Sequence, residues 1–141
     1  MKFWDSSAIV PLLLEEPARD RLLAMLESDP VMVVWWATPV ELVSALSRRE
    51  RDGGISIEDV TASIDRLRSL ERAWHSVLPA DAVRSRAQRL LRVHPLRAAD
   101  SLQLAAALSI AGDDPASLTF VSLDQRLSDA ARREGLEVRT G

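Results

Sequence analysis

The hydrophobic pattern along the chain has two periods, one typical of short buried strands and one typical of amphipathic helices. Residues 31–35 form a continuous apolar run rich in valine, which is typical of a strand covered on both faces. Shorter runs predict strands at residues 2–4, 74–77, 118–123 and 136–139. Helical patterns predict helices at residues 7–14, 17–28, 38–52, 56–72, 80–93, 96–108 and 124–134. Strands that alternate with helices in this way predict an α/β fold with a mainly parallel central sheet flanked by helices.

Local signals indicate where several of these helices begin and end. Pro17 stands at a favoured first helical position, and Gly135 follows the last predicted helix as a C-terminal cap. The sequence Thr38-Pro39-Val40-Glu41 matches a capping box, with threonine at the cap and glutamate three residues later. We therefore expect Thr38 to cap its helix and Glu41 to lie in the first turn.

One carboxylate interrupts the apolar face of the predicted helix LRAADSLQLAAAL, residues 96–108. Asp100, Leu104, Ala107 and Ala111 share one helical face by their spacing. An unpaired buried charge is strongly unfavourable, so another part of the chain has to neutralise Asp100 if this face is buried.

Composition places the chain among soluble globular proteins. With 141 residues, of which 47% are hydrophobic and 28% charged, we expect one domain spanning residues 1–141. The absence of cysteine excludes disulfides, thiolate metal sites and a cysteine nucleophile. No apolar run approaches the roughly 18 residues of a membrane helix, and Asp5 and Glu15 interrupt the region where a secretion signal would lie. We therefore expect a cytoplasmic protein that does not enter a membrane.

Four carboxylates are predicted to meet at one edge of the sheet. Asp5 follows the first strand, Asp124 follows the fourth, and Glu41 and Asp100 lie in the first turns of their helices. Singly, each has an ordinary structural explanation, because Asp5 and Asp124 suit N-caps, Glu41 suits a capping box, and Asp100 suits the positive end of a helix. Together they would gather where parallel sheets bind ligands.

Such a cluster needs neutralising charge. Two carboxylates about 4 Å apart repel by about 4 kcal/mol at an effective dielectric constant of 20. Divalent cations with oxygen ligands relieve this repulsion, and Mg²⁺ takes carboxylates, waters and substrate phosphate oxygens. Ser6, Ser7 and Ser122 lie next to these acids in the sequence and either form turns and caps or hold a metal-bound water. The pattern predicts a divalent metal site.

Four ordered blocks resemble the PIN-domain ribonucleases, and specifically the VapC-type toxins of toxin–antitoxin pairs. These blocks are WDSSAIVPLLLEEP, ATPVELVSALSRR, LRAADSLQLAAAL and FVSLDQRLSDAA, and they extend over essentially the whole chain. The resemblance implies a single PIN-like domain with a central parallel sheet, and cleavage of RNA phosphodiester bonds that leaves a 5′-phosphate and a 3′-hydroxyl.

The resemblance also implies roles for individual residues and partners. Asp5, Glu41, Asp100 and Asp124 would be the catalytic acids that hold Mg²⁺ or Mn²⁺. Ser7, Ser122 and Arg97 are candidate contacts to the RNA substrate. A cognate antitoxin protein would neutralise the toxin, with helices at residues 7–14 and 19–26 offering a groove for it, and we expect a homodimer.

Other chemistries fit the sequence less well. The two histidines, His75 and His94, are not placed with the acids, which disfavours metal-free acid–base cleavage of RNA. No G-x-S-x-G motif supports a serine hydrolase, and a receiver-type phosphoacceptor would need a lysine late in the chain, whereas the only lysine is Lys2. A PIN-like protein-binding module without catalytic activity remains the alternative.

The remaining charged and aromatic residues suggest how a substrate is held. Nearly all cations are arginines, and Arg48, Arg49, Arg51 and the arginines of residues 84–92 are candidates to guide an RNA backbone. An acidic cleft repels phosphates, so some cationic rim is required. Trp4 and Trp35 are expected in the core, and core packing is also favoured for Trp36 over stacking on a base.

Overall fold

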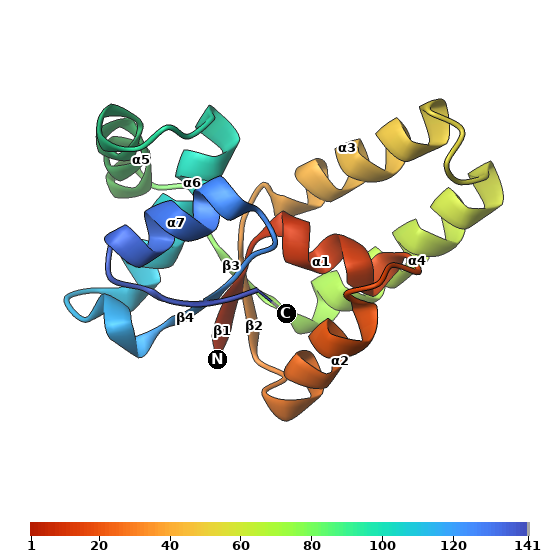
Figure 1. Ribbon diagram of the computed structural model, residues 1–141, viewed down its shortest axis with the longest axis horizontal. Coiled ribbons are helices and arrows are strands. Elements are labelled where there is room, and N and C mark those ends of the chain that lie inside the picture. Colours follow the sequence, from red (N-terminus) through yellow and green to blue (C-terminus); the bar gives the residue numbers. More distant parts are fainter. Residues whose placement is uncertain (141) are drawn as a thin grey trace.

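The computed structural model describes residues 1–140 and contains a parallel sheet with helices on both faces (Figure 1). The strands lie in the order β3-β2-β1-β4-β5, and each neighbouring pair is parallel. Their bounds are β1 Lys2–Trp4, β2 Met32–Trp35, β3 His75–Val77, β4 Thr119–Val121 and β5 Glu137–Arg139. The predicted α/β fold with a parallel sheet is confirmed, and the strands at residues 118–123 and 136–139 are shorter than expected.

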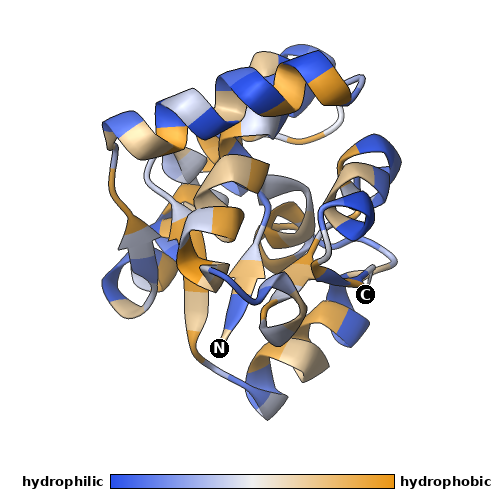
Figure 2. Ribbon diagram, turned by 90° about the vertical axis from the view of Figure 1, so that its left-hand side faces the viewer, coloured by the Kyte–Doolittle hydropathy of each residue, from blue (hydrophilic) through white to orange (hydrophobic). Residues whose placement is uncertain are grey.

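Within residues 1–140, seven α-helices and one 3₁₀-helix connect the strands. They are α1 Ser6–Leu13, α2 Arg19–Ser28, α3 Thr38–Arg51, α4 Ile57–Ala73, α5 Asp81–Val93, α6 Ala98–Ala111, η1 Pro115–Ser117 and α7 Gln125–Arg133. Helices α1 to α4 pack on one face of the sheet and α5 to α7 on the other, each with its own apolar cluster (Figure 1). Figure 2 shows hydrophobic and hydrophilic positions alternating along the helices, as expected when each helix buries one side.

The strand order creates a switch point between β1 and β4. From β1 the chain moves to one side to form β2 and β3, and later returns to the other side to form β4 and β5. Phe3 of β1 stacks on Phe120 of β4, with ring centroids 5.6 Å apart, which fixes these strands side by side. Their carboxyl ends therefore open a crevice between helices that leave toward opposite faces, and such crevices bind ligands in parallel sheets.

Two local expectations about the fold are wrong. Helix α2 begins at Arg19 rather than at Pro17, because the Arg19 amide donates to the Glu16 carbonyl and residues 16–19 first form a turn. Trp36 is 55% exposed rather than part of the core, since β2 ends at Trp35 and the chain turns before α3. Trp4 and Trp35 are buried as predicted.

Within residues 1–140, no helix combines the length and apolar character that crossing a lipid bilayer requires.

Candidate active site

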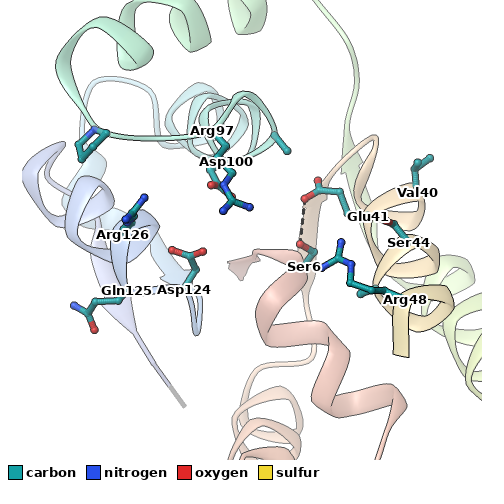
Figure 3. Close-up of a pocket in the computed structure, with 13 residues that line it drawn as sticks. Ser6, Val40, Glu41, Ser44, Arg48, Arg97, Asp100, Asp124, Gln125 and Arg126 are labelled. Carbon is teal, nitrogen blue, oxygen red and sulfur yellow. Dashed lines mark hydrogen bonds between the residues drawn. The ribbon is translucent and has the colours of Figure 1, made fainter. Parts of the chain in front are cut away.

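A cleft of about 720 Å³ lies at the carboxyl ends of the central strands and is lined by three of the four predicted acids. Glu41 of α3 and Ser6 of α1 stand on one wall, while Asp100 of α6 and Asp124, the N-cap of α7, stand on the other (Figure 3). The walls come from opposite faces of the sheet, so the cleft occupies the switch point between β1 and β4.

Asp5 lies beneath this cleft and is only 3% exposed. Its Oδ2 atom accepts hydrogen bonds from the Ser7 amide, the Ser7 hydroxyl and the Ser122 hydroxyl. Its Oδ1 atom has one long contact, 3.5 Å from the Ser6 hydroxyl that lines the cleft. Three protein donors thus surround Oδ2, whereas Oδ1 accepts only the long contact from Ser6.

Glu41 is held from two neighbouring helices rather than by a capping box. The N-cap of α3 is Ala37, which makes no side-chain capping bond, so the predicted cap at Thr38 is wrong. Gln103 Nε2 instead donates to Glu41 Oε2 over 2.8 Å and to Thr38 Oγ1 over 3.1 Å. The Ser6 hydroxyl donates to Glu41 Oε1 over 3.2 Å (Figure 3). Thr38 and Glu41 therefore bind residues of other helices and do not form the predicted capping box.

Asp100 and Asp124 occupy the amino-terminal ends of their helices. Asp124 caps α7, with its Oδ1 accepting from the Leu127 amide over 2.9 Å, and its own amide donates to the Ser122 hydroxyl over 3.1 Å. Asp100 is half-buried, while Leu104 and Ala107 on the same helical face are fully buried. The apolar face of α6 therefore continues into the core, and its carboxylate faces the cleft.

Burial and mutual repulsion shape the charge of this site. Burial raises the pKa of Asp5, the Ser7 and Ser122 hydrogen bonds oppose this, and the charge of Asp100 adds to it. Burial raises the pKa of Glu41 to about 7, the Gln103 hydrogen bond opposes the rise, and the charges of Asp5 and Asp100 reinforce it. Burial and the charge of Asp124 raise the pKa of Asp100, against the lowering effect of Arg97.

The acids and serines of the cleft are the types of ligand that a divalent cation prefers, although they are not yet close enough together to coordinate one. Carboxylate and hydroxyl oxygens are the ligands that Mg²⁺ and Mn²⁺ prefer, and a cation would relieve the repulsion that raises these pKa values. Within residues 1–140, no three acidic or histidine side chains already lie close enough to hold a metal ion. A cation here would keep water or substrate oxygens among its ligands.

Arginines surround the acids at the rim of the cleft. Arg48, Arg97 and Arg126 line it, and none of them forms an ion pair with the residues that the structure describes (Figure 3). Other predicted candidates are engaged elsewhere, because Arg49 pairs with Glu16 and the arginines of α5 extend over a different part of the surface. On α5, Arg84 pairs with Asp81 and Arg89 with Glu134.

The two histidines lie away from the acids, whereas the predicted contacts Ser7, Ser122 and Arg97 lie beside them. His75 is exposed on β3 and His94 is buried near Glu134, so neither lines the acidic cleft. Ser122 is fully buried and Ser7 is half-buried, and their hydroxyls bind Asp5. Arg97 lies at the cleft as the N-cap residue of α6.

Two residues at the cleft were not predicted from the sequence. Gln103 of α6 is fully buried and binds Glu41 of α3. The available signal was its position, because it is a polar residue one turn after Asp100 in a run of leucine and alanine. Arg126 sits one residue after the start of α7, and its position two residues beyond Asp124 pointed to the same rim.

Comparisons with known proteins agree with this arrangement. A family model described as PIN domain matches residues 2–133. The fold resembles FitAcB from Neisseria gonorrhoeae, with 18% identity, a TM-score of 0.69, and coverage of 99% of this chain and 97% of the other. It also resembles a toxin-antitoxin complex from Klebsiella pneumoniae, with 14% identity, a TM-score of 0.68, and coverage of 99% and 97%.

A third similar structure is VapC20 from Mycobacterium tuberculosis, a toxin described as cleaving the sarcin-ricin loop. It shares 17% identity with this chain at a TM-score of 0.66, with coverage of 99% of this chain and 100% of the other. At these identities the likeness shows a shared fold. No curated protein matches the chain significantly in sequence.

Proposed function

Because the chain belongs to the PIN domain family, we propose that it is a metal-dependent endoribonuclease and the toxin of a VapC-type toxin–antitoxin pair. The observation that carries this proposal is the convergence of Glu41, Asp100 and Asp124 on one cleft, above the buried Asp5. These carboxylates come from four separate segments of the chain. Burial raises the pKa of Asp5, Glu41 and Asp100, and the charge of a neighbouring acid adds to each rise. Clustered charge of this kind is costly to a fold and is typical of a catalytic site.

The acids would hold Mg²⁺ or Mn²⁺, and the chain's own contacts support this role. Asp5 would use its Oδ1 atom, because Oδ2 is occupied by the Ser7 and Ser122 hydroxyls. Glu41, Asp100 and Asp124 would complete the site from the two walls. A bound divalent cation supplies Lewis acidity, which makes water a better nucleophile and stabilises the leaving oxygen of a phosphodiester.

The protein residues then have positioning and electrostatic tasks. Ser7 and Ser122 keep the Asp5 carboxylate in one orientation, and Ser6 joins Asp5 to Glu41. Since a divalent cation makes water a sufficient nucleophile toward phosphorus, hydrolysis would need no covalent enzyme intermediate.

RNA would enter along the arginine rim. Arg48 stands on the α3 wall, whereas Arg97 and Arg126 stand on the α6 and α7 wall, so cations flank the acids on both sides (Figure 3). Phosphate contacts of this kind position a backbone without selecting its sequence. Arg48 and Arg97 were suggested by the sequence, whereas Arg126 was not. Arg49, Arg84 and Arg89 form ion pairs elsewhere, so we do not assign them to this rim.

The proposed partners are an antitoxin protein and a second copy of the chain, and the proposed location is the cytoplasm. Similar structures include one described as a toxin-antitoxin complex, which supports the antitoxin. Helices α1 and α2 pack together, and an antitoxin helix would bind along them.

Cleavage of structured RNA by the purified protein in Mg²⁺ tests this function. Asp5→Asn and Asp100→Asn should abolish cleavage, and EDTA should stop the unmodified protein. Asp113→Asn is the matched control, since this exposed acid lies beyond the opposite end of α6 from Asp100. Cleavage that survives both substitutions, or that ignores EDTA, refutes the proposal.

The alternative, a PIN-like binding module without catalytic activity, makes a different prediction. It expects neither Mg²⁺ binding nor cleavage, while the fold and the partner surface stay intact. A calorimetric titration of the unmodified protein with Mn²⁺ separates the two functions, because only the nuclease requires binding at the acids.

A further inference from the structure

Gln103 is a fully buried amide between the two helices that carry Asp100 and Glu41. It lies on α6, three residues after Asp100, and none of its surface is exposed. Polar side chains at such positions require partners, because an unsatisfied amide in the core is unfavourable. Its contacts therefore indicate what the residue does.

Both hydrogens of the Gln103 amide nitrogen have acceptors on α3. Nε2 lies 2.8 Å from Glu41 Oε2 and 3.1 Å from Thr38 Oγ1, and an amide nitrogen carries two hydrogens. The bond to Glu41 is charge-assisted when that carboxylate is ionised, which makes it the stronger of the two. Gln103 thus binds two side chains in the first turn of α3, those of Glu41 and Thr38.

Glu41 is in consequence held at both of its oxygens. Gln103 binds Oε2, and the Ser6 hydroxyl binds Oε1 over 3.2 Å. Since Gln103 and Asp100 share one turn of α6, the hydrogen bond to Glu41 links the acid of one wall to the acid of the other. The separation of the two carboxylates across the cleft is set through this amide.

Packing alone does not explain a glutamine at this place. Its carbonyl oxygen, Oε1, is buried and has no hydrogen-bond partner among residues 1–140. An apolar side chain of similar length, such as methionine, would fill the same volume without an orphaned acceptor. The orphaned carbonyl is unfavourable in the core, so the choice of an amide is explained by what its nitrogen binds.

We propose that Gln103 is a positioning residue that orients the Glu41 carboxylate for the divalent cation shared with Asp100 and Asp5. The inference rests on the proposed metal-dependent function and adds a residue that touches neither the cation nor the RNA. Partners that orient metal ligands in this way typically contribute roughly 10- to 100-fold to metal affinity or activity.

The test compares Gln103→Met with Gln88→Met, which makes the same replacement on the exposed surface of α5. Mn²⁺ affinity is measured by calorimetry and thermal stability by circular dichroism. We expect Gln103→Met to fold with at most a modest fall in thermal stability, because Glu41 and Thr38 lose a donor while an orphaned carbonyl is removed. It should bind Mn²⁺ roughly 10-fold more weakly or worse. Gln88→Met should behave as the unmodified protein in both measurements.

A double-mutant cycle with Glu41→Gln distinguishes positioning from general damage. If Gln103 acts through Glu41, Gln103→Met should have little further effect on Mn²⁺ affinity once Glu41 is replaced. An equal loss in both backgrounds, or an unchanged affinity in Gln103→Met, overturns the inference while leaving the proposed nuclease intact. An unmodified protein that binds no Mn²⁺ overturns both.

A measurement on the unmodified protein keeps the inference testable if the variant does not fold. The side-chain amide signals of Gln103 in nitrogen-15 NMR spectra should shift when Mg²⁺ is added and should exchange slowly with solvent. Signals of Gln103 that do not respond to Mg²⁺, in a protein whose other cleft residues do respond, overturn the inference.

Discussion

The Ser122 hydroxyl donates a hydrogen bond to Asp5 Oδ2 over 3.0 Å, and the two residues are 117 positions apart in the sequence. Ser122 follows β4 and Asp5 follows β1, so this bond joins the two strands at the switch point of the sheet. The same hydroxyl accepts from the Asp124 amide over 3.1 Å, which connects the two acids that cap α1 and α7. One buried serine thus links both walls of the cleft.

Replacing Ser122 with alanine should weaken catalysis and stability together. The substitution removes one of the donors to Asp5 and leaves the Asp124 amide without its partner. We expect about 1 kcal/mol less stability in urea unfolding and roughly 10-fold lower cleavage activity. Ser128→Ala, at a buried hydroxyl without a partner in the described residues, is the control and should leave cleavage unchanged. Unaltered cleavage by Ser122→Ala would show that Asp5 does not depend on this bond.

The metal-free protein should lose stability as the pH rises from about 4.5 to about 7. In this range folded Glu41 keeps a proton that the unfolded chain has already released, so each increase in pH favours unfolding. The raised pKa values of Asp5 and Asp100 act in the same direction. The groups facing Glu41 are Ser6, Gln103 and these two acids.

Urea unfolding at several pH values checks this dependence. Glu41→Gln should flatten the curve, because the amide does not ionise. Mg²⁺ should stabilise the protein more at pH 8 than at pH 5, since it binds the deprotonated acids. A stability that rises between pH 5 and pH 7 in the absence of metal contradicts the charge state described for the site.

Replacing Arg48 or Arg126 with glutamine should raise KM for RNA and leave kcat nearly unchanged. Both side chains line the rim, and neither forms an ion pair with an acid among residues 1–140. Each lost phosphate contact should reduce the slope of log affinity against log salt by about 0.7 for single-stranded RNA. Arg84→Gln is the control, because Arg84 is exposed and pairs with Asp81, and it should change neither KM nor kcat. A fall in kcat at constant KM would assign these arginines a different role.

Trp36 should be nearly irrelevant to stability, in contrast to Trp4. Trp36 is 55% exposed, whereas Trp4 is fully buried against helices α1 to α4. Trp36→Ala should change the free energy of unfolding by about 0.5 kcal/mol or less, and Trp4→Ala should lower it by about 3–5 kcal/mol. If both variants lost the same free energy of unfolding in urea, Trp36 would have to be buried in the core, which would contradict its exposed position.

The strands and the gathering of the acids could be predicted because both depend on local pattern and on parallel topology. Apolar runs such as residues 31–35 mark buried strands, and acids that follow parallel strands must reach the same edge. Asp124 caps a helix and lines the cleft, and Asp5 caps a helix beneath it, so the capping role and the proposed metal-binding role are compatible.

Long-range contacts set the limits of that prediction. Thr38 and Glu41 match a capping box, yet Gln103, 65 and 62 positions away, binds both side chains. Trp36 continues an apolar run, but its side chain faces solvent because the strand ends one residue earlier. Neither outcome is encoded within a window of a few residues, since both depend on where another element packs.

Anomalous diffraction from crystals of the protein soaked in Mn²⁺ would show whether the acids share a divalent cation. We expect a manganese peak in the cleft, bound by Asp5 Oδ1 and by carboxylate oxygens of Glu41 or Asp100, and absent from crystals of Asp100→Asn. A peak elsewhere on the molecule, or an empty cleft at saturating Mn²⁺, would contradict the claim that these acids share a divalent cation.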